Sequence, residues 1–427
     1  MGNLSAIVLQ YSPMKITQLV RTIRSRLLLQ VTPVYFRLCN RLQRSYFLRN
    51  AKRHPYDSPK PGITIVAGLG GNVSLSKVMR DLAFSLRDAG IPFQTFSLSP
   101  RNKIPPQDIL PILTPVKDFR ARKFSHVLEM FGSNFPAEEL GLKRMTIAFW
   151  EFESGLPELR PELKAKPALI GMSDFNVRYF RSTFSSKPVA KVLYPFRQSQ
   201  TVLESISSVR KRYGISKEAF MVFFNFDFDS GYHRKNPYGV MKAFGQAFGS
   251  TANARLVFKT VHASSHPDKV SDLRHLARQL NIEDKCISID QFISQKDLYG
   301  LTNACDAYIS LHRGEGFGLG IAEAMSFGKA VIVTNYSAPT EFCTINNSIL
   351  IPYRLVPPDA AQQDVPYYRN VRLWAEPDIN KAANALRLLY NDPQERKRLG
   401  EAAQKTILQH FSISRFKESV KSVLSTY

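Results

Sequence analysis

Two glutamates stand eight positions apart in a glycine-rich stretch of the chain, the segment HRGEGFGLGIAEAMSFGKAVIVT at 312–334. Glu315 lies on a loop that follows an apolar run, and Glu323 lies in the first turn of the helix expected after it. Because glycine carries no β-carbon, Gly316 and Gly318 allow the loop backbone to come within hydrogen-bonding distance of a ligand. The start of the helix adds a partial positive charge that suits a phosphate.

The two carboxylates call for a different kind of group from the one that the helix start attracts. Ionised carboxylates only accept hydrogen bonds, and the vicinal hydroxyls of a ribose or a hexose are paired donors. Acids on both sides of a phosphate-accepting helix start therefore suit a ligand with a sugar at each end of a diphosphate, which is a nucleotide sugar. The alternative is that Glu315 and Glu323 are ordinary helix-capping acids.

Alternating strand-like and helix-like segments surround this loop. One series begins with a buried-type strand at 63–67 and continues to about 196, and a second begins with AFMVFFNF at 219–226. Such alternation predicts parallel sheets covered by helices, here in two similar halves. Ligands of these sheets bind beyond the carboxyl ends of the strands. We therefore predict an α/β protein with two Rossmann-like domains that face each other across a cleft.

The length of the chain and its linkers suggest where the domains begin and end. A chain of 427 residues is long for a single hydrophobic core. The segment HPYDSPKPG at 54–62 contains three prolines and is expected to be a linker. The expected divisions are a basic extension with linker at 1–60, a first domain at 61–205, a second domain at 206–405 and a terminal helical segment at 406–427.

A second glycine turn follows the first predicted strand, in VAGLGGN at 66–72. This turn lacks the third glycine of the G-x-G-x-x-G pattern, and no acid ends the next strand to bind a ribose, so a dehydrogenase-type dinucleotide site is not favoured. The bare backbone at Gly70 and Gly71 is instead expected to approach a phosphate or the acceptor substrate.

The charge of the chain is strongly basic and unevenly distributed. The chain has 58 Lys and Arg against 35 Asp and Glu, and residues 1–60 alone hold 11 basic residues and one acid. Such an excess favours anionic partners. Apolar positions between 16 and 27 recur at helical spacing beside basic ones, which predicts that residues 1–55 lie on an anionic membrane surface. The alternative is a solvated helix that packs on its own domain.

The remaining composition favours a cytoplasmic protein. The four cysteines lie far apart without C-x-x-C spacing, so neither a zinc site nor a disulfide framework is indicated, and we predict no metal site. The longest uncharged stretch near the start is too short to span a bilayer and lacks a basic segment ahead of it. We expect a cytoplasmic protein, peripheral on the inner face of the membrane if residues 1–55 bind there.

The segment LHRGEGFGLGIAEAMSFGKAVIVTNYSAPTEF at 311–342 resembles retaining glycosyltransferases of family 4, which have the GT-B fold and an E-x7-E pattern. The resemblance continues through FFNFDFDSGYHRKNPYGVMKAFGQAF before this segment and WAEPDINKAANALRLLYNDPQERKRLGEAA after it. It is looser in the first half of the chain. It implies the GT-B fold, with a terminal helix at 414–424 that crosses back to the first domain.

The resemblance implies a role for each residue of the E-x7-E segment. Glu323 would bind the ribose hydroxyls of the nucleotide. Glu315 would bind hydroxyls of the donor sugar, together with backbone amides near Gly316, Phe317 and Gly318.

Basic residues before this segment would bind the diphosphate of the donor. Lys235 matches the position whose charge stabilises the leaving group. The arginine that usually precedes this lysine by five or six residues is absent, and Arg234 is the nearest substitute; the alternative is a solvated pair. Lys259 and His312 are further donor-side candidates, against a solvated lysine and a structural histidine.

On the acceptor side, Trp150 and Glu151 resemble a W-E element of the family, against a core tryptophan and a surface acid. The resemblance implies a retaining, metal-independent transfer without a cofactor, with a UDP- or GDP-linked sugar as co-substrate. The donor phosphate would help to deprotonate the incoming hydroxyl. The basic start of the chain suggests a glycan or lipid-linked acceptor in polysaccharide or cell-envelope assembly.

Two other classes of function remain as alternatives. A nucleic-acid-binding or anionic-surface-binding protein would explain the charge, but it predicts aromatic residues interleaved with the basic run, and we expect no nucleic-acid partner. A catalytically inactive GT-B relative predicts the loss of Glu315 or Lys235, and both are present.

Overall fold

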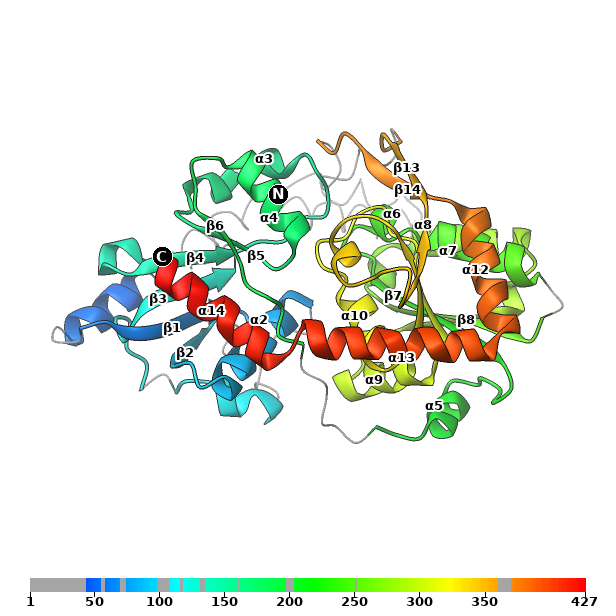
Figure 1. Ribbon diagram of the computed structural model, residues 1–427, viewed down its shortest axis with the longest axis horizontal. Coiled ribbons are helices and arrows are strands. Elements are labelled where there is room, and N and C mark those ends of the chain that lie inside the picture. The colour runs from blue at the N-terminus through cyan, green and yellow to red at the C-terminus, as the bar shows by residue number, and fades with distance from the viewer. Residues whose placement is uncertain are drawn as a thin grey trace, which may run out of the picture.

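The structure is a computed structural model that describes most of the chain (Figure 1). The described residues are 44–54, 58–69, 74–98, 107–115, 118–130, 135–159, 161–196, 203–249, 252–359, 362 and 370–427. Most of the predicted basic extension, residues 1–43, lies outside this set, and so do Gly70 and Gly71. None of the helices in the described ranges combines the length and the apolar character needed to cross a bilayer.

The first half of the chain forms a six-stranded parallel sheet with the order β2-β1-β3-β4-β5-β6. Its strands are β1 Lys60–Ala67, β2 Phe93–Ser97, β3 Phe124–Met130, β4 Lys143–Ile147, β5 Leu169–Gly171 and β6 Val189–Lys191. Its helices are α2 Ser74–Asp88, α3 Leu156–Leu159 and α4 Asp174–Thr183. Helix α2 buries Val78, Leu82 and Leu86 in the core of this domain, as their helical spacing predicts.

The second half forms another six-stranded parallel sheet, with the order β12-β11-β10-β7-β8-β9. Its strands are β7 Phe220–Asp227, β8 Ala254–Val261, β9 Cys286–Asp290, β10 Ala307–Ser310, β11 Ala330–Thr334 and β12 Ile349–Ile351. Its helices are α5 Ile206–Arg212, α6 Tyr232–Lys235, α7 Pro237–Phe248, α8 Pro267–Gln279, α9 Gln295–Ala304, α10 Leu319–Ser326 and α12 Ile379–Asn391.

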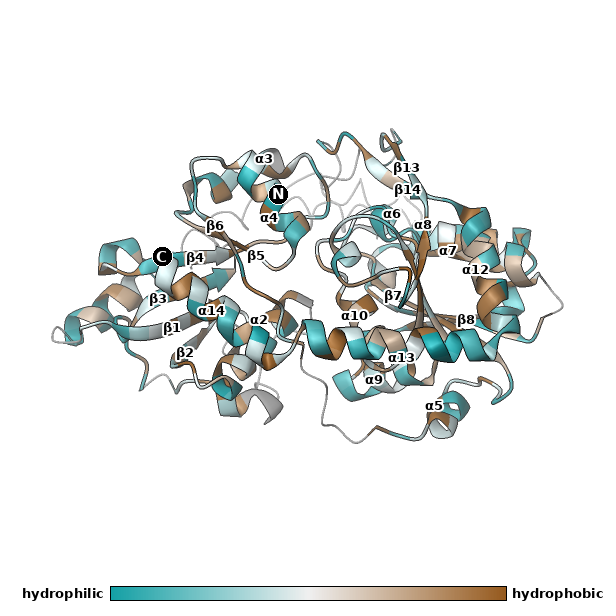
Figure 2. Cartoon of the chain, in the orientation of Figure 1, coloured by the Kyte–Doolittle hydropathy of each residue, from teal (hydrophilic) through white to brown (hydrophobic). Residues whose placement is uncertain are grey.

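Strand β7 shows how an unbroken apolar run serves both faces of this sheet. Phe220 and Val222 belong to the core under α7 and α12, whereas Met221 and Phe223 belong to the core under α10. Alternate side chains of a strand point to opposite faces, so a central strand with helices on both sides must be apolar throughout. Figure 2 shows the result, with hydrophobic strands inside and hydrophilic outer faces on the helices.

The end of the chain ties the two domains together. Helix α13, Pro393–His410, packs along α10 and β11 of the second domain, and helix α14, Ile413–Thr426, lies over the first (Figure 1). Helix α14 buries Phe416, Val420 and Val423 against that domain. The remaining elements are an antiparallel pair, β13 Tyr353–Val356 and β14 Trp374–Pro377, and short 3-10 helices, η2 Gln107–Ile112, η3 Glu138–Leu140, η4 Pro161–Ala165, η5 Ala263–Ser265, η6 Glu283–Lys285 and η7 Ala338–Glu341.

Residues 44–53, from the end of the basic segment, form a helix that packs on the first sheet. Phe47 is fully buried there and contacts the rings of Phe96 and Phe135 at 4.6 and 4.5 Å between centroids. Arg44 forms an exposed ion pair with Glu139 at 2.6 Å. These described residues therefore follow the alternative of a helix packed on its own domain, because an aromatic side chain anchors them in its core.

The predicted fold class is confirmed: two parallel α/β domains with GT-B architecture, covered by helices. The basic extension in that prediction falls almost wholly outside the described residues.

Candidate active site

The glycine-rich loop connects β10 to α10 at the carboxyl edge of the second sheet. Gly318 precedes α10 with a φ of +92°, a left-handed conformation that other residues rarely adopt. The backbone N–H of Glu315 donates to Ser337 Oγ at 2.9 Å, and its carbonyl accepts from the N–H of Ala338 at 3.2 Å. These bonds fix the loop against the segment that leads into η7.

The carboxylate of Glu315 lies beside two cations from the end of α6. Its Oε2 accepts from Lys235 Nζ at 2.5 Å and from Arg234 Nη1 at 3.2 Å. Burial opposes ionisation of this carboxyl, but Lys235 and Arg234 outweigh burial and lower its pKa to about 2. Glu315 is therefore a permanent hydrogen-bond acceptor at neutral pH.

Arg234 is buried and joins several parts of the site. It donates to the backbone carbonyls of Gly314 at 2.9 Å and Ser230 at 2.7 Å. Its Nη2 also lies 3.6 Å from Glu151 Oε1 of the first domain, where burial raises the pKa of the Glu151 carboxyl and Arg234 opposes that rise. The residue suggested as a substitute for the missing arginine is thus placed next to Glu315.

Asn236 explains how Lys235 comes to face the loop. It adopts a left-handed conformation, with φ of 59°, that separates α6 from α7. Its side chain donates to the carbonyl of Leu311 at 2.9 Å and accepts from the N–H of Gly239 at 3.0 Å. It therefore caps α7 and ties the end of α6 to β10. Burial lowers the pKa of Lys235, and the nearby Glu315 opposes this.

Glu323 lies in α10 and is only 4% exposed. Its closest cation is Lys77 of the first domain, whose Nζ lies 3.7 Å from Glu323 Oε1. Burial raises the pKa of this carboxyl to about 7, although Lys77 opposes the rise. The charge state of Glu323 thus differs from that of Glu315.

The charges of both carboxylates act on Tyr308 of β10. Burial raises the pKa of the Tyr308 phenol, and the charges of Glu315 and then Glu323 raise it further. Its hydroxyl donates to Asn225 Oδ1 at 2.7 Å. A β-carbon on Gly320 would lie 2.5 Å from this hydroxyl oxygen, so only glycine fits there.

Two other glycines of the loop make room for the backbone of the first domain. A β-carbon on Gly314 would lie 2.7 Å from the carbonyl oxygen of Glu151, and one on Gly316 would lie 3.2 Å from that of Trp150. Ser173 Oγ of the first domain donates to the carbonyl of Gly316 at 3.2 Å. The domains are therefore in backbone contact at this loop.

Phe317 and Trp150 have buried side chains. The ring of Phe317 packs on Tyr194 at a centroid distance of 4.8 Å. Trp150 is 3% exposed, and its indole N–H donates to the carbonyl of Ser154 at 2.8 Å. Trp150 is thus a core residue that brings its own backbone to the loop, while the neighbouring Glu151 carries the charged side chain.

His312 and Lys259 lie at strand ends on the same edge of the sheet. Both ring nitrogens of His312 are bonded within the protein, Nδ1 with Ser310 Oγ and Nε2 with the carbonyl of Tyr336, each at 3.1 Å. Burial lowers the His312 pKa to about 4, so the ring is neutral. Lys259 donates to the carbonyl of Thr260 at 2.7 Å, and burial lowers its pKa to about 8.

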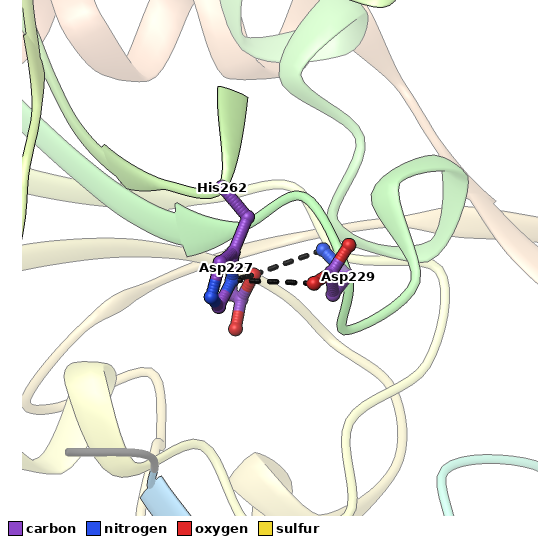
Figure 3. A group of neighbouring side chains, drawn as sticks. All are labelled: Asp227, Asp229 and His262. Carbon is purple, nitrogen blue, oxygen red and sulfur yellow. Dashed lines mark hydrogen bonds and ion pairs between the residues drawn. The ribbon is translucent and has the colours of Figure 1, made fainter. Parts of the chain in front are cut away.

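A group of possible metal ligands was missed in the sequence analysis. Asp227, Asp229 and His262 place one ligand atom each within 4.8 Å of one another at the ends of β7 and β8 (Figure 3). His262 Nδ1 lies 2.8 Å from Asp227 Oδ1, and this hydrogen bond raises the His262 pKa. The D-x-D spacing of Asp227 and Asp229 was a readable signal, whereas nothing in the sequence places His262 beside them.

The contact between Lys77 and Glu323 was also missed. The two residues come from different domains, and no local pattern links them. An ion pair between Lys191 of β6 and Glu341 of η7 likewise joins the domains.

The second domain matches a known protein family. Residues 228–406 match the model of the family "Glycosyl transferases group 1". No curated protein matches the sequence.

Several solved structures share the fold over most of this chain. A glycosyltransferase from Rickettsia africae is 13% identical with a TM-score of 0.61, covering 86% of this chain and 98% of its own. HepE from Anabaena, in complex with UDP and glucose, is 16% identical with a TM-score of 0.60, covering 86% and 100%. Sucrose-phosphate synthase from Thermosynechococcus elongatus is 13% identical with a TM-score of 0.61, covering 86% and 99%. The chain thus has a GT-B fold whose second domain matches the group 1 glycosyl transferases.

Proposed function

We propose that the protein is a retaining glycosyltransferase that moves a sugar from a UDP- or GDP-linked donor to a hydroxyl acceptor without a required metal. The observation that carries this proposal is the placement of two buried acids on the loop and helix of one glycine-rich segment, with Glu315 beside the cations of α6 and Glu323 in α10. The family match and the fold of HepE, which was solved with UDP and glucose, support it.

The donor would lie along the glycine-rich loop with its two sugars at the two acids. Glu323 accepts hydrogen bonds from the ribose hydroxyls, and Glu315 accepts them from the hydroxyls of the transferred sugar. The backbone amides from Gly316 to Gly318 and the start of α10 face the negative charge between them.

Transfer requires stabilisation of the diphosphate as the glycosidic bond breaks. Lys235 and Arg234 supply positive charge from a largely buried position, where electrostatic stabilisation is stronger than in water. Their ion pairs with Glu315 hold both side chains in place before the donor arrives, which lowers the cost of reorganisation. Lys259 lies farther along the same edge of the sheet and makes a weaker donor-side candidate.

The acceptor would enter from the first domain. Glu151 is an acidic side chain of the first domain that lies 3.6 Å from Arg234, and Trp150 fixes its backbone through the buried indole. We propose a glycan or lipid-linked acceptor, because the basic residues before position 44 would favour an anionic membrane surface.

Release of UDP or GDP from a panel of nucleotide sugars, with and without lipid-linked acceptors, tests the proposed activity. We expect donor-dependent release in the wild type and none in Glu315→Ala. Glu283→Ala is a matched control, because this exposed acid pairs only with exposed Arg278 in the described structure. Absence of release with every donor would contradict the proposal and favour a binding protein or an inactive relative.

The membrane part of the proposal needs a truncation that spares the fold. The deletion is confined to residues 2–43, because a deletion to residue 55 would also remove Phe47 from the core of the first domain. We expect the truncated protein to lose co-sedimentation with anionic liposomes and to keep turnover of soluble substrates. Unchanged sedimentation would contradict the membrane role.

A further inference from the structure

One oxygen of Glu323 lacks a hydrogen-bond partner within the described structure. The side chain is 5% exposed, and Oε1 has no donor within bonding distance. A buried polar atom left unpaired costs free energy, so such an atom in a folded protein calls for an explanation. Lys77 Nζ lies 3.7 Å away, close enough for charge attraction but longer than a hydrogen bond.

Lys77 is held in place by its own domain rather than by Glu323. Its Nζ donates to Asp81 Oδ2 at 2.5 Å, one turn along α2, and lies 3.4 Å from the hydroxyl of Tyr194. Tyr194 in turn donates to Asp81 and packs its ring against Phe317. The ammonium group is thus fixed near Glu323 without occupying its free oxygen.

Building on the proposed donor site, we propose that Lys77 is a positioning residue that the first domain supplies to the donor site. Its charge keeps Glu323 ionised when the domains are in contact and leaves Oε1 free to accept a hydroxyl of the donor ribose. When the domains separate, Lys77 moves away with α2 and Glu323 loses its nearest cation. Contact between the domains and binding of the nucleotide are therefore coupled through the ion pair of Lys77 and Glu323.

The groups that face Glu323 support this assignment. From α2, Lys77 favours the ionised form and Asp81 opposes it. Burial raises the pKa of two phenols, Tyr299 of α9 and Tyr308 of β10. At Tyr299 the charge of Glu323 raises the pKa further. At Tyr308 the charge of Glu315 and then that of Glu323 do so. Both phenols therefore remain neutral near pH 7. Lys77 and Asp81 are then the charged groups that influence whether Glu323 is ionised.

Besides burial, Lys77 and Asp81 are the charged groups that shift the Glu323 pKa. Strand β11 has the sequence AVIVT, which contains no titratable side chain. Helix α13 contacts α10 through Gln404, which donates to the carbonyl of Ser326 at 2.8 Å. With the Glu323 pKa at about 7, loss of the Lys77 charge would leave this carboxyl largely protonated at neutral pH.

The test combines three variants with titrations of UDP and GDP between about pH 6 and about pH 9, a range that includes the raised Glu323 pKa of about 7. Wild-type affinity should fall as pH drops through about 7. Lys77→Met should move this midpoint upward by about one pH unit or more. At neutral pH it should raise the donor KM about tenfold and leave kcat at saturating donor unchanged.

Two further variants separate the charge of Lys77 from its packing. Lys77→Arg keeps the charge and should retain the wild-type midpoint. Glu323→Gln cannot ionise and should bind the nucleotide weakly with no midpoint near pH 7. Arg87→Met is the matched control, because Arg87 is a half-exposed cation on the same helix and should leave the midpoint unchanged.

A measurement on the ligand-free protein keeps the test independent of the donor. The infrared carboxyl band that Glu323→Gln lacks should titrate near pH 7 in the wild type and at higher pH in Lys77→Met. An unchanged midpoint in Lys77→Met, in a variant with wild-type circular dichroism, would overturn the role of Lys77 while leaving the donor site intact. A wild type that binds neither UDP nor GDP would instead overturn the proposed function, and this inference with it.

Discussion

Glu315 and Glu323 are identical side chains in one short segment, and both are largely buried, yet their surroundings drive their ionisation in opposite directions. Glu315 has two cations at 2.5 and 3.2 Å and a pKa of about 2, whereas Glu323 has one cation at 3.7 Å and a pKa of about 7. Burial alone therefore does not set the charge of these acids. The number and distance of nearby cations decide it, and those cations come from different domains.

The largest expected effect is on stability when Glu315 loses its charge. Glu315→Gln leaves Lys235 and Arg234 buried beside a neutral group, and breaking a buried pair in this way costs about 3–5 kcal/mol. The folded pKa of Glu315 is depressed, so its stabilisation is present above the unfolded pKa of about 4.3 and is lost as pH falls through about 2. Chemical denaturation at neutral pH measures the loss, and Glu283→Gln at an exposed ion pair should change stability by less than about 1 kcal/mol. Equal effects of the two substitutions would contradict this account of the Glu315 site.

The next effect concerns turnover. Lys235→Met removes the cation closest to Glu315 and to the expected diphosphate, and we expect kcat to fall by about 10²–10³-fold. Steady-state kinetics at saturating donor measures this. Lys242→Met, an exposed lysine on α7, is the control and should keep wild-type kcat. A fall confined to the donor KM would assign Lys235 to binding alone.

Glu323→Gln should have a smaller effect on stability, and one of opposite sign. The folded pKa of Glu323 is raised to about 7, so the folded wild type loses stability as pH rises from about 4.3 to about 7. The glutamine variant escapes this loss and should be more stable than the wild type by about 1–3 kcal/mol at pH 8, with the difference shrinking toward pH 5. Denaturation midpoints across this range measure it. Destabilisation that grows with pH would show that Glu323 resembles Glu315 after all.

The smallest effect is expected at Tyr308, whose phenol is influenced by the charges of both acids. Tyr308→Phe removes the hydroxyl that donates to Asn225 at 2.7 Å, and the loss of one buried hydrogen bond costs about 1 kcal/mol. Because Tyr308 is neutral, the midpoint for nucleotide binding near pH 7 should not move. A shifted midpoint would show that Tyr308 takes part in setting the charge of Glu323.

Much of the fold is predictable because local patterns determine it. The segment PYGVMKAFGQAF matches α7, and AVIVT matches β11, since apolar periodicity and the turn residues at their ends agree. Glu315 lies on the predicted loop and Glu323 on the helix that follows, but this helix begins at Leu319, so Glu323 lies in its second turn and not in the predicted first turn. The first series of elements is expected to continue to about 196, but its last strand ends at Lys191, after which the chain leaves the sheet and carries Tyr194 to the domain interface.

The site is less predictable because much of it depends on contacts between distant segments. The sequence explains Gly316 as room for a ligand, while the structure places the carbonyl of Trp150 against it. Lys77 lies far from Glu323 in the sequence, and only the packing of the two domains brings them together. The position of the helix at 44–53 also depends on contacts with distant segments. Its basic residues suggest a membrane surface, but the fully buried side chain of Phe47 packs this helix on the first domain.

The most direct test of the central claim is a crystal structure of the protein with UDP or GDP, whichever it binds in titration. We expect the ribose hydroxyls within hydrogen-bonding distance of Glu323 Oε1 and the diphosphate beside Lys235 and Arg234. A nucleotide bound elsewhere, with Glu323 still facing only Lys77 and Glu315 still paired with α6, would contradict it.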